Sequence, residues 1–147
     1  MANTEQASAA ERGRSKLLTR IKEAQAKAGR VSRGALAKTA QELDISLAEA
    51  FGTATFYSFI TTEPTGRNII RICKSVPCCL QEAEMIIDTV ASEFDLLPGR
   101  TTADGRFTLK LTNCIGACDT APAMLVNDDL HGDLTPARIV EILKTYA

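Results

Sequence analysis

The sequence predicts an α+β protein, in which an N-terminal small helical bundle precedes an α/β domain. Apolar residues recur at helical spacing from Leu17 onward, whereas short β-branched and alternating runs separate the helical patterns after Ile69. All five cysteines lie in the second part of the 147-residue chain. We therefore expect two domains, residues 1–66 and 67–147. Residues 1–10, which are polar and small, are expected to be disordered.

The N-terminal region has the signals of three helices. The apolar face of the first comprises Leu17, Leu18, Ile21, Ala24 and Ala28. Gly29 follows as a helix stop, and Ser32 is placed as the N-cap of a second helix. Ser46 and Glu49 form a capping box for a third. The apolar and aromatic run over residues 51–59 is expected to be either core or a docking surface.

A helix-turn-helix is the alternative interpretation of residues 32–51, because two short helices follow a basic one there. The expected recognition helix from Leu47 carries Glu49 and apolar residues but no Arg, Lys, Asn or Gln that could read bases. The sequence therefore favours a structural bundle and no nucleic-acid partner.

Strands and helices alternate in the second region. The expected elements are a strand over 69–73, a helix over 79–95, strands over 107–112 and 124–126, and a final helix with Thr135 as N-cap and Pro136 at its first position. Leu80 begins the apolar face of the first of these helices. Phe107, Leu109 and Leu111 form the buried face of the second strand. This order fits a thioredoxin-like α/β arrangement.

Four cysteines follow two of these strands, as Cys73-x4-Cys78 and Cys114-x3-Cys118. If the two strands are parallel neighbours across a right-handed crossover, both pairs lie at one edge of the sheet. Four thiolates suit zinc or an iron–sulfur cluster. Zinc knuckles more often use C-x2-C pairs, so the wider spacing favours a [2Fe–2S] cluster with one pair per iron, and zinc remains the alternative.

The residues around these cysteines support thiolate ligands. Ser75, Gly116 and Ala117 are small, which lets backbone N–H groups approach the sulfurs. Cys78 lies near the start of the helix expected over 79–95, where the helix dipole favours a thiolate.

No catalytic residues are expected on this chain. Cys79 is expected to be a buried or semi-buried bystander. His131, the single histidine, is expected to be a surface or turn residue rather than a catalytic base. No acid–base pair can be named, so a stand-alone enzyme is disfavoured.

Composition excludes several function classes. The formal net charge of -1 disfavours nucleic-acid and membrane-surface binding, and the longest uncharged stretch, residues 50–62, is too short to span a bilayer. The sequence contains no G-x-G and no P-loop, so another chain is expected to bind any nucleotide. We see no secretory signal and no transit-like extension, and a bacterial cytoplasmic location is expected.

The sequence resembles the thioredoxin-like [2Fe–2S] small subunit of NADH dehydrogenase modules, which serves respiratory complex I, NAD-linked hydrogenases (electron-bifurcating [FeFe] ones included) and NAD-dependent formate dehydrogenases. The resemblance covers nearly the whole chain from about Leu17. It rests on Gly52-Thr53-Ala54-Thr55-Phe56-Tyr57, Cys73-x4-Cys78, Asn113-Cys114-Ile115-Gly116-Ala117-Cys118, Ala121-Pro122 and Leu134-Thr135-Pro136. Cys79 departs from the family pattern, in which the residue after the second cysteine is commonly histidine or another residue that is not a ligand.

The resemblance implies that Cys73, Cys78, Cys114 and Cys118 ligate one [2Fe–2S] cluster. It also implies a flavoprotein partner that holds FMN and binds NAD(H), on which the helical region packs, and further iron–sulfur or hydrogenase subunits. The chain would then be a non-catalytic electron-transfer subunit of an NAD(P)H-linked oxidoreductase.

Among such complexes, we favour a soluble hydrogenase, the electron-bifurcating type included, over complex I or a formate dehydrogenase. Two alternatives come from other classes: a cluster-sensing DNA-binding regulator and a zinc-stapled interaction module.

Overall fold

The computed structural model describes residues 9–146, with side chains described from residue 13 onward. The chain divides into two compact units, Met1–Pro64 and Thr65–Ala147, and each is described by itself. The disorder expected over 1–10 falls on residues outside the described part, except that Ala9 and Ala10 begin a helix. Within the described residues, no helix has the length and apolarity needed to cross a membrane.

The first unit contains three helices, α1 (Ala9–Ala28), α2 (Arg33–Glu42) and α3 (Leu47–Phe56), as the sequence predicts. Gly29, with a φ of 70°, follows α1. Two serine side chains cap the other helices: Ser32 accepts a hydrogen bond from the Ala35 N–H at 3.2 Å, and Ser46 accepts one from the Glu49 N–H at 3.1 Å. The core between the helices comprises Leu17, Ile21, Val31, Leu36, Ala40, Ala50 and Ala54.

The second unit is built on a mixed four-stranded sheet in the order β2-β1-β3-β4. Its strands are β1 (Asn68–Cys73), β2 (Phe107–Thr112), β3 (Met124–Val126) and β4 (Asp129–His131). β1 and β2 are parallel neighbours, whereas β3 is antiparallel to both β1 and β4. The sequence did not predict β4, because its three residues are too few to show an alternating pattern.

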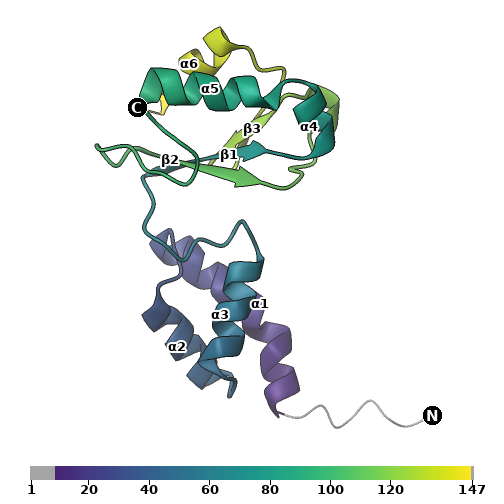
Figure 1. Cartoon of the computed structure of the whole chain (residues 1–147). Helices are drawn as coiled ribbons and strands as arrows, with labels where there is room; N and C mark the ends of the chain where they lie inside the picture. Colours follow the sequence, from purple (N-terminus) through teal and green to yellow (C-terminus); the bar gives the residue numbers. More distant parts are fainter. Residues whose placement is uncertain (1–8, 147) are drawn as a thin grey trace, which may run out of the picture. The chain divides into compact units, whose positions relative to one another are not determined.

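Three helices accompany this sheet: α4 (Val76–Leu80), α5 (Ala83–Phe94) and α6 (Pro136–Thr145). Figure 1 shows α5 and α6 on the same side of the sheet, with α4 beyond the end of β1. α6 begins as predicted, with the Thr135 hydroxyl accepting from the Arg138 N–H at 3.4 Å. The core comprises Ile70, Ile72, Ile86, Val90, Leu96, Phe107, Leu109, Met124, Val126, Leu134, Ile139 and Leu143.

The single helix expected over residues 79–95 is wrong, because the chain breaks it at Glu82. Glu82 has a left-handed φ of 60°, which separates α4 from α5. Cys78 and Ala83 are both buried, yet a separation of five residues would place them on different faces of one helix. The break lets both face inward, and it leaves Leu80, expected on the buried face, 78% exposed.

The alternation expected along β2 is not observed, because its first three residues are all buried. Phe107 and Leu109 are buried, but Leu111 is exposed, whereas Thr108 on the opposite face is buried. The Thr108 hydroxyl accepts a hydrogen bond from the Gly66 N–H at 2.7 Å, which satisfies a polar group in this buried position. At Thr108 the pattern therefore fails because a hydrogen bond from a residue distant in sequence, rather than apolar character, accompanies burial.

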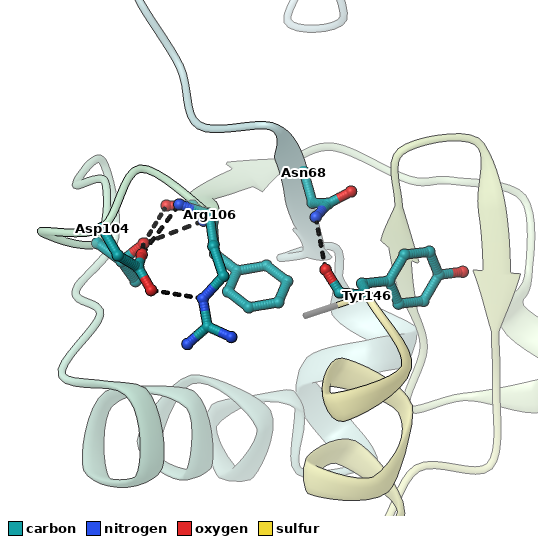
Figure 2. A network of polar contacts seen from close by, with 6 residues as sticks. Asn68, Asp104, Arg106 and Tyr146 are labelled. Carbon is teal, nitrogen blue, oxygen red and sulfur yellow. Dashed lines mark hydrogen bonds and ion pairs between the residues drawn. The ribbon is translucent and has the colours of Figure 1, made fainter.

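Polar contacts fix the end of the sheet at which β1 begins (Figure 2). The Asn68 side chain donates to the Tyr146 carbonyl oxygen at 3.0 Å and so joins the start of β1 to the end of α6. In the loop before β2, Asp104 forms an ion pair with Arg106. Hydrogen bonds from Thr102 and Arg106 hold the pKa of Asp104 well below its usual range. The opposite end of β1 carries the cysteines.

Candidate metal centre

The four motif cysteines leave one edge of the sheet. Cys73 is the last residue of β1, and Cys114 follows β2 by two residues. β1 and β2 run parallel in register, with Cys73 opposite Thr112, so their carboxyl ends meet at the same edge. The parallel arrangement on which the sequence argument depended is therefore present.

Cys73 and Cys78 form a buried pair, each only 1% exposed. Ala83, Ile115 and Ala121 pack around them. Each of the two sulfurs affects the pKa of the other. The loop between them thus folds back so that both sulfurs lie in an apolar setting.

Cys114 and Cys118 form an exposed pair. Their sulfurs lie 3.6 Å apart. The chain turns between them at Gly116, whose φ of 85° favours glycine and whose N–H donates to the Cys114 sulfur at 3.4 Å. The turn at Gly116 therefore holds the two sulfurs of this exposed pair close together.

The sulfurs are arranged as two pairs that interact with one another. The charge of Cys118 contributes to raising the pKa of Cys78, and the charge of Cys73 contributes to raising that of Cys118. Across the part of the chain that the structure describes, no three Cys, His, Asp or Glu side chains are grouped closely enough to hold one metal ion. Two thiolates at about 2.3 Å from one tetrahedral ion are about 3.8 Å apart, so the exposed pair has the spacing of two ligands on one metal.

The pKa values of the buried pair move in opposite directions. Burial acts to raise the pKa of Cys73, but hydrogen bonds from Ser75, Cys78 and the Ile115 N–H outweigh it and lower that pKa. Burial, the hydrogen bond with Cys73 and the charge of Cys73 raise the pKa of Cys78 to about 11. Cys78 lies in the first turn of the five-residue helix α4 rather than at the start of a helix over 79–95, and burial and Cys73 set the direction of its pKa in the metal-free chain.

The pKa of Cys118 is also raised. The hydrogen bond with Cys114 and the charge of that neighbouring sulfur are the main causes. A bound metal ion would displace the proton that the two sulfurs share, and its positive charge would offset the repulsion between them.

Two N–H groups at this site were not foreseen from the sequence. The backbone N–H of Ile115 acts to lower the pKa of Cys73, and that of Ala123 acts to lower the pKa of Cys78. Ala123 follows the Ala121-Pro122 dipeptide, which was singled out only through the family resemblance. Hydrogen bonds across loops depend on the tertiary arrangement, so no local pattern in the sequence signals them.

Cys79 and His131, the two remaining candidates from the sequence, lie outside the two cysteine pairs. Cys79 is exposed, contrary to the expected burial, and its sulfur donates to the Lys74 carbonyl oxygen at 3.4 Å. His131 lies in β4 rather than in a turn. It is half-buried, with its Nε2 atom 3.2 Å from the Tyr146 hydroxyl, which donates to Asp129 at 2.7 Å.

The aromatic run of the first unit is exposed rather than core. Its members, termed here the aromatic surface, are Phe51, Phe56, Tyr57 and Phe59. Phe56 is the most exposed, at 80%, and contacts the Tyr57 ring edge-on. Of the two roles left open by the sequence, the exposure supports a docking surface.

Comparison with known proteins gives close relatives among the subunits of NADH-quinone oxidoreductases. The chain is 40% identical over 126 residues to one such subunit of Pseudomonas aeruginosa, and 41% identical over 126 residues to its counterpart in Escherichia coli K12. Each match covers 86% of this chain and 76% of the relative.

A solved structure of an NAD+-reducing [NiFe]-hydrogenase matches 89% of this chain with a TM-score of 0.77 and 28% identity. The chain spans about a fifth of that hydrogenase chain, since the match covers 22% of it.

A family match covers residues 3–147, almost the entire chain, and carries the description thioredoxin-like [2Fe–2S] ferredoxin. The family implies a [2Fe–2S] cluster, and the helices followed by a mixed four-stranded sheet are the fold expected for it. The chain therefore belongs to the thioredoxin-like [2Fe–2S] ferredoxin family.

Proposed function

We propose that Cys73, Cys78, Cys114 and Cys118 hold the [2Fe–2S] cluster, with the buried pair on one iron and the exposed pair on the other. The observation that carries this proposal is the pairwise arrangement of the sulfurs at one sheet edge. A cluster with two irons needs two thiolates on each, which matches two pairs better than one compact group of four. Cys79 is left out because its sulfur bonds to the Lys74 carbonyl.

When bound, the cluster supplies one-electron transfer. The protein's contribution comes from its own residues. The apolar side chains around Cys73 and Cys78 keep water from those sulfurs, and backbone N–H groups from Ser75, Ile115 and Ala123 donate to them. Such hydrogen bonds draw charge from the sulfurs and set the reduction potential. Cys114 and Cys118 bring the other side of the site to the surface, where a partner can approach.

We further propose that the chain is the electron-transfer component of an NADH-linked multisubunit oxidoreductase, next to the flavin of a partner that holds FMN and binds NAD(H). Its relatives include subunits of NADH-quinone oxidoreductases and a structure of an NAD+-reducing hydrogenase. Cluster thiolates persist most readily where thiols stay reduced, which agrees with the expected cytoplasmic location.

Two kinds of complex are represented among these relatives. The hydrogenase structure supports the hydrogenase favoured from the sequence, whereas the higher identity, 40–41%, is to subunits of quinone-linked complexes. We propose that the terminal acceptor is determined by other subunits, so that the co-purifying proteins identify the complex. No observation favours the DNA-binding or zinc-stapled alternative.

The proposed function is tested by isolating the tagged chain from its native cells under anaerobic conditions. We expect a flavin-containing subunit to co-purify and NADH to reduce the cluster of the complex, as seen by its [2Fe–2S] EPR signal. A chain that is isolated without a flavoprotein, or whose signal does not respond to NADH, would contradict the proposal.

The aromatic surface gives a matched test of partner binding. Replacing Phe56 by Ala should reduce flavoprotein recovery at least roughly tenfold, as for an interface hot spot, while leaving thermal stability unchanged because Phe56 is already 80% exposed. Leu97→Ala removes a different exposed apolar side chain, 58% exposed, and should retain the partner. Equal recovery of the flavoprotein with both variants would place the interface elsewhere.

A further inference from the structure

An open hollow on the surface of the first unit is lined by Glu49, Gly52, Thr53, Phe56 and Tyr57. Its volume is about 410 Å³, toward the lower end of the range of roughly 300–1,000 Å³ for ligand pockets, so it fits a long side chain rather than a helix. Its lining residues within α3 are three or four positions apart and therefore share one face of that helix. The hollow thus follows α3 from its first turn to its C-cap residue, Tyr57.

Gly52 keeps the middle of this hollow open. A Cβ atom added there would meet nothing within 4 Å beyond its own stretch of helix, and the φ of Gly52 lies outside the left-handed region. Neither the backbone nor the packing therefore requires glycine at this position, and glycine within a helix lowers stability relative to alanine. Gly52 leaves space at the surface that the fold of the first unit does not use.

The two ends of the hollow carry a carboxylate and two aromatic rings. Glu49 is the only charged residue of α3, and its side chain is 31% exposed. Arg14 of α1 donates to both of its oxygens, at 2.5 and 3.5 Å, without lining the hollow. Because a carboxylate has about four lone-pair sites, Glu49 can accept from a second cation. At the other end, Phe56 is 80% exposed and contacts Tyr57 edge-on, with ring centroids 5.1 Å apart.

We propose that this hollow receives an arginine side chain of the flavoprotein partner. The inference rests on the proposed function, because it takes the aromatic surface to be the face that binds the flavoprotein. A guanidinium group stacks on an aromatic ring and donates to a carboxylate through two N–H groups, whereas an apolar side chain would use only the rings. A carboxylate and rings at the two ends of one hollow therefore complement a planar cation on a long stem.

Binding of the flavoprotein subunit, purified from native cells, to the immobilised full chain with its cluster tests the charge. Glu49→Gln keeps the size of the side chain and should weaken binding about tenfold, the effect of one hydrogen bond to a charged group. Arg14→Gln breaks the same ion pair within the first unit but leaves the carboxylate, so it should bind as tightly as the unaltered chain. If Glu49 acted only by joining α1 to α3, both variants would weaken binding equally, and that result would overturn the proposal.

Two further pairs of variants test the rings and the space. Phe56→Leu keeps an apolar side chain without an aromatic face and should weaken binding about threefold, whereas Phe56→Tyr should retain it. Gly52→Leu fills the hollow with a strong helix former, so it should raise the thermal midpoint and yet weaken binding. Gly34→Leu makes the same change in α2, outside the hollow, and should lower neither the midpoint nor the affinity. Equal binding by the two glycine variants would overturn the proposal.

The outcomes distinguish this inference from the proposal on which it rests. An unaltered chain that binds no flavoprotein would overturn the proposed function, and this inference with it. An unaltered chain and a Glu49→Gln chain that bind the flavoprotein equally would overturn the arginine site alone. Weaker binding by Glu49→Gln, Phe56→Leu and Gly52→Leu, with binding retained by Arg14→Gln, Phe56→Tyr and Gly34→Leu, would establish it.

Discussion

The two cysteine pairs reach the same edge of the sheet but lie in different surroundings. Cys73 and Cys78 are each 1% exposed and are enclosed by apolar side chains, whereas Cys114 and Cys118 are exposed. Backbone N–H groups from several loops act to lower the pKa values of the buried pair, whereas the hydrogen bond from Gly116 to Cys114 comes from within the exposed pair's own turn.

The buried and the exposed cysteine pairs therefore serve two different tasks of an electron-transfer site. The buried pair provides a dry environment in which hydrogen bonds tune the potential strongly. The exposed pair provides access, because electron transfer to another subunit requires the site to approach the surface. Three perturbations test this division of tasks.

Replacing Cys78 by Ser should have the largest effect. It removes a ligand and places a hydroxyl in the apolar setting formed by Ala83, Ile115 and Ala121, at a cost of about 1–3 kcal/mol in the free energy of unfolding. We expect the [2Fe–2S] EPR signal to be lost or shifted, and urea unfolding of the metal-free variant to have a lower midpoint.

Two cysteine variants serve as controls. Cys114→Ser should also lose or shift the signal, but with a smaller change in stability because Cys114 is exposed. Cys79→Ser should keep both the signal and the stability. If Cys79→Ser abolished the signal and Cys78→Ser retained it, the ligand set would be wrong.

High pH should weaken the fold of the metal-free chain through Cys78. Burial and the neighbouring Cys73 raise the pKa of Cys78 from 9.0 to about 11. A thiol whose pKa is higher in the folded state stabilises the fold fully below its unfolded pKa, and that contribution is lost as the pH rises through the folded pKa. We expect the free energy of unfolding to fall by roughly 2 kcal/mol between about pH 9 and pH 11.

Urea titrations across this pH range measure the effect. Cys73 has a lowered pKa, so its contribution is lost only as the pH falls and is constant above about pH 9. The comparison variant Cys78→Ser lacks the raised thiol pKa and should show a smaller decline. An equal decline in both proteins would assign the loss to other groups.

Replacing Gly116 by Ala should have a smaller effect, confined to the exposed pair. Nothing lies within 4 Å of the added Cβ, but the φ of 85° is unfavourable for alanine, at a cost of about 1 kcal/mol. Relaxation of the turn would move the N–H away from Cys114, so the loaded variant should lose iron faster in air while keeping its fold.

Gly34→Ala is the matched control, since Gly34 lies in α2 without a positive φ. It should be neutral or slightly stabilising and should leave iron retention unchanged. Equal iron loss from Gly34→Ala and Gly116→Ala would show that the turn at Gly116 does not control iron retention.

The elements that carry the cysteines could be predicted from local sequence. The strands at 69–73 and 107–112 and the caps at Ser32, Ser46 and Thr135 follow from periodicity and capping, which act over a few residues.

Features set by tertiary contacts were missed. Glu82 adopts a left-handed conformation that no glycine signals, and the three residues of β4 form a strand only because β3 pairs with them. The contrast between buried and exposed cysteines was likewise invisible, because the spacings C-x4-C and C-x3-C do not encode burial. The donors from Ile115 and Ala123 depend on how the loops meet.

We propose that the two cysteine pairs hold the two irons of one cluster. The most direct measurement is the iron, acid-labile sulfide and zinc content of the anaerobically purified chain, with EPR after dithionite reduction. We expect two irons, two sulfides and a rhombic S = 1/2 signal per chain. Stoichiometric zinc without an EPR signal would contradict it.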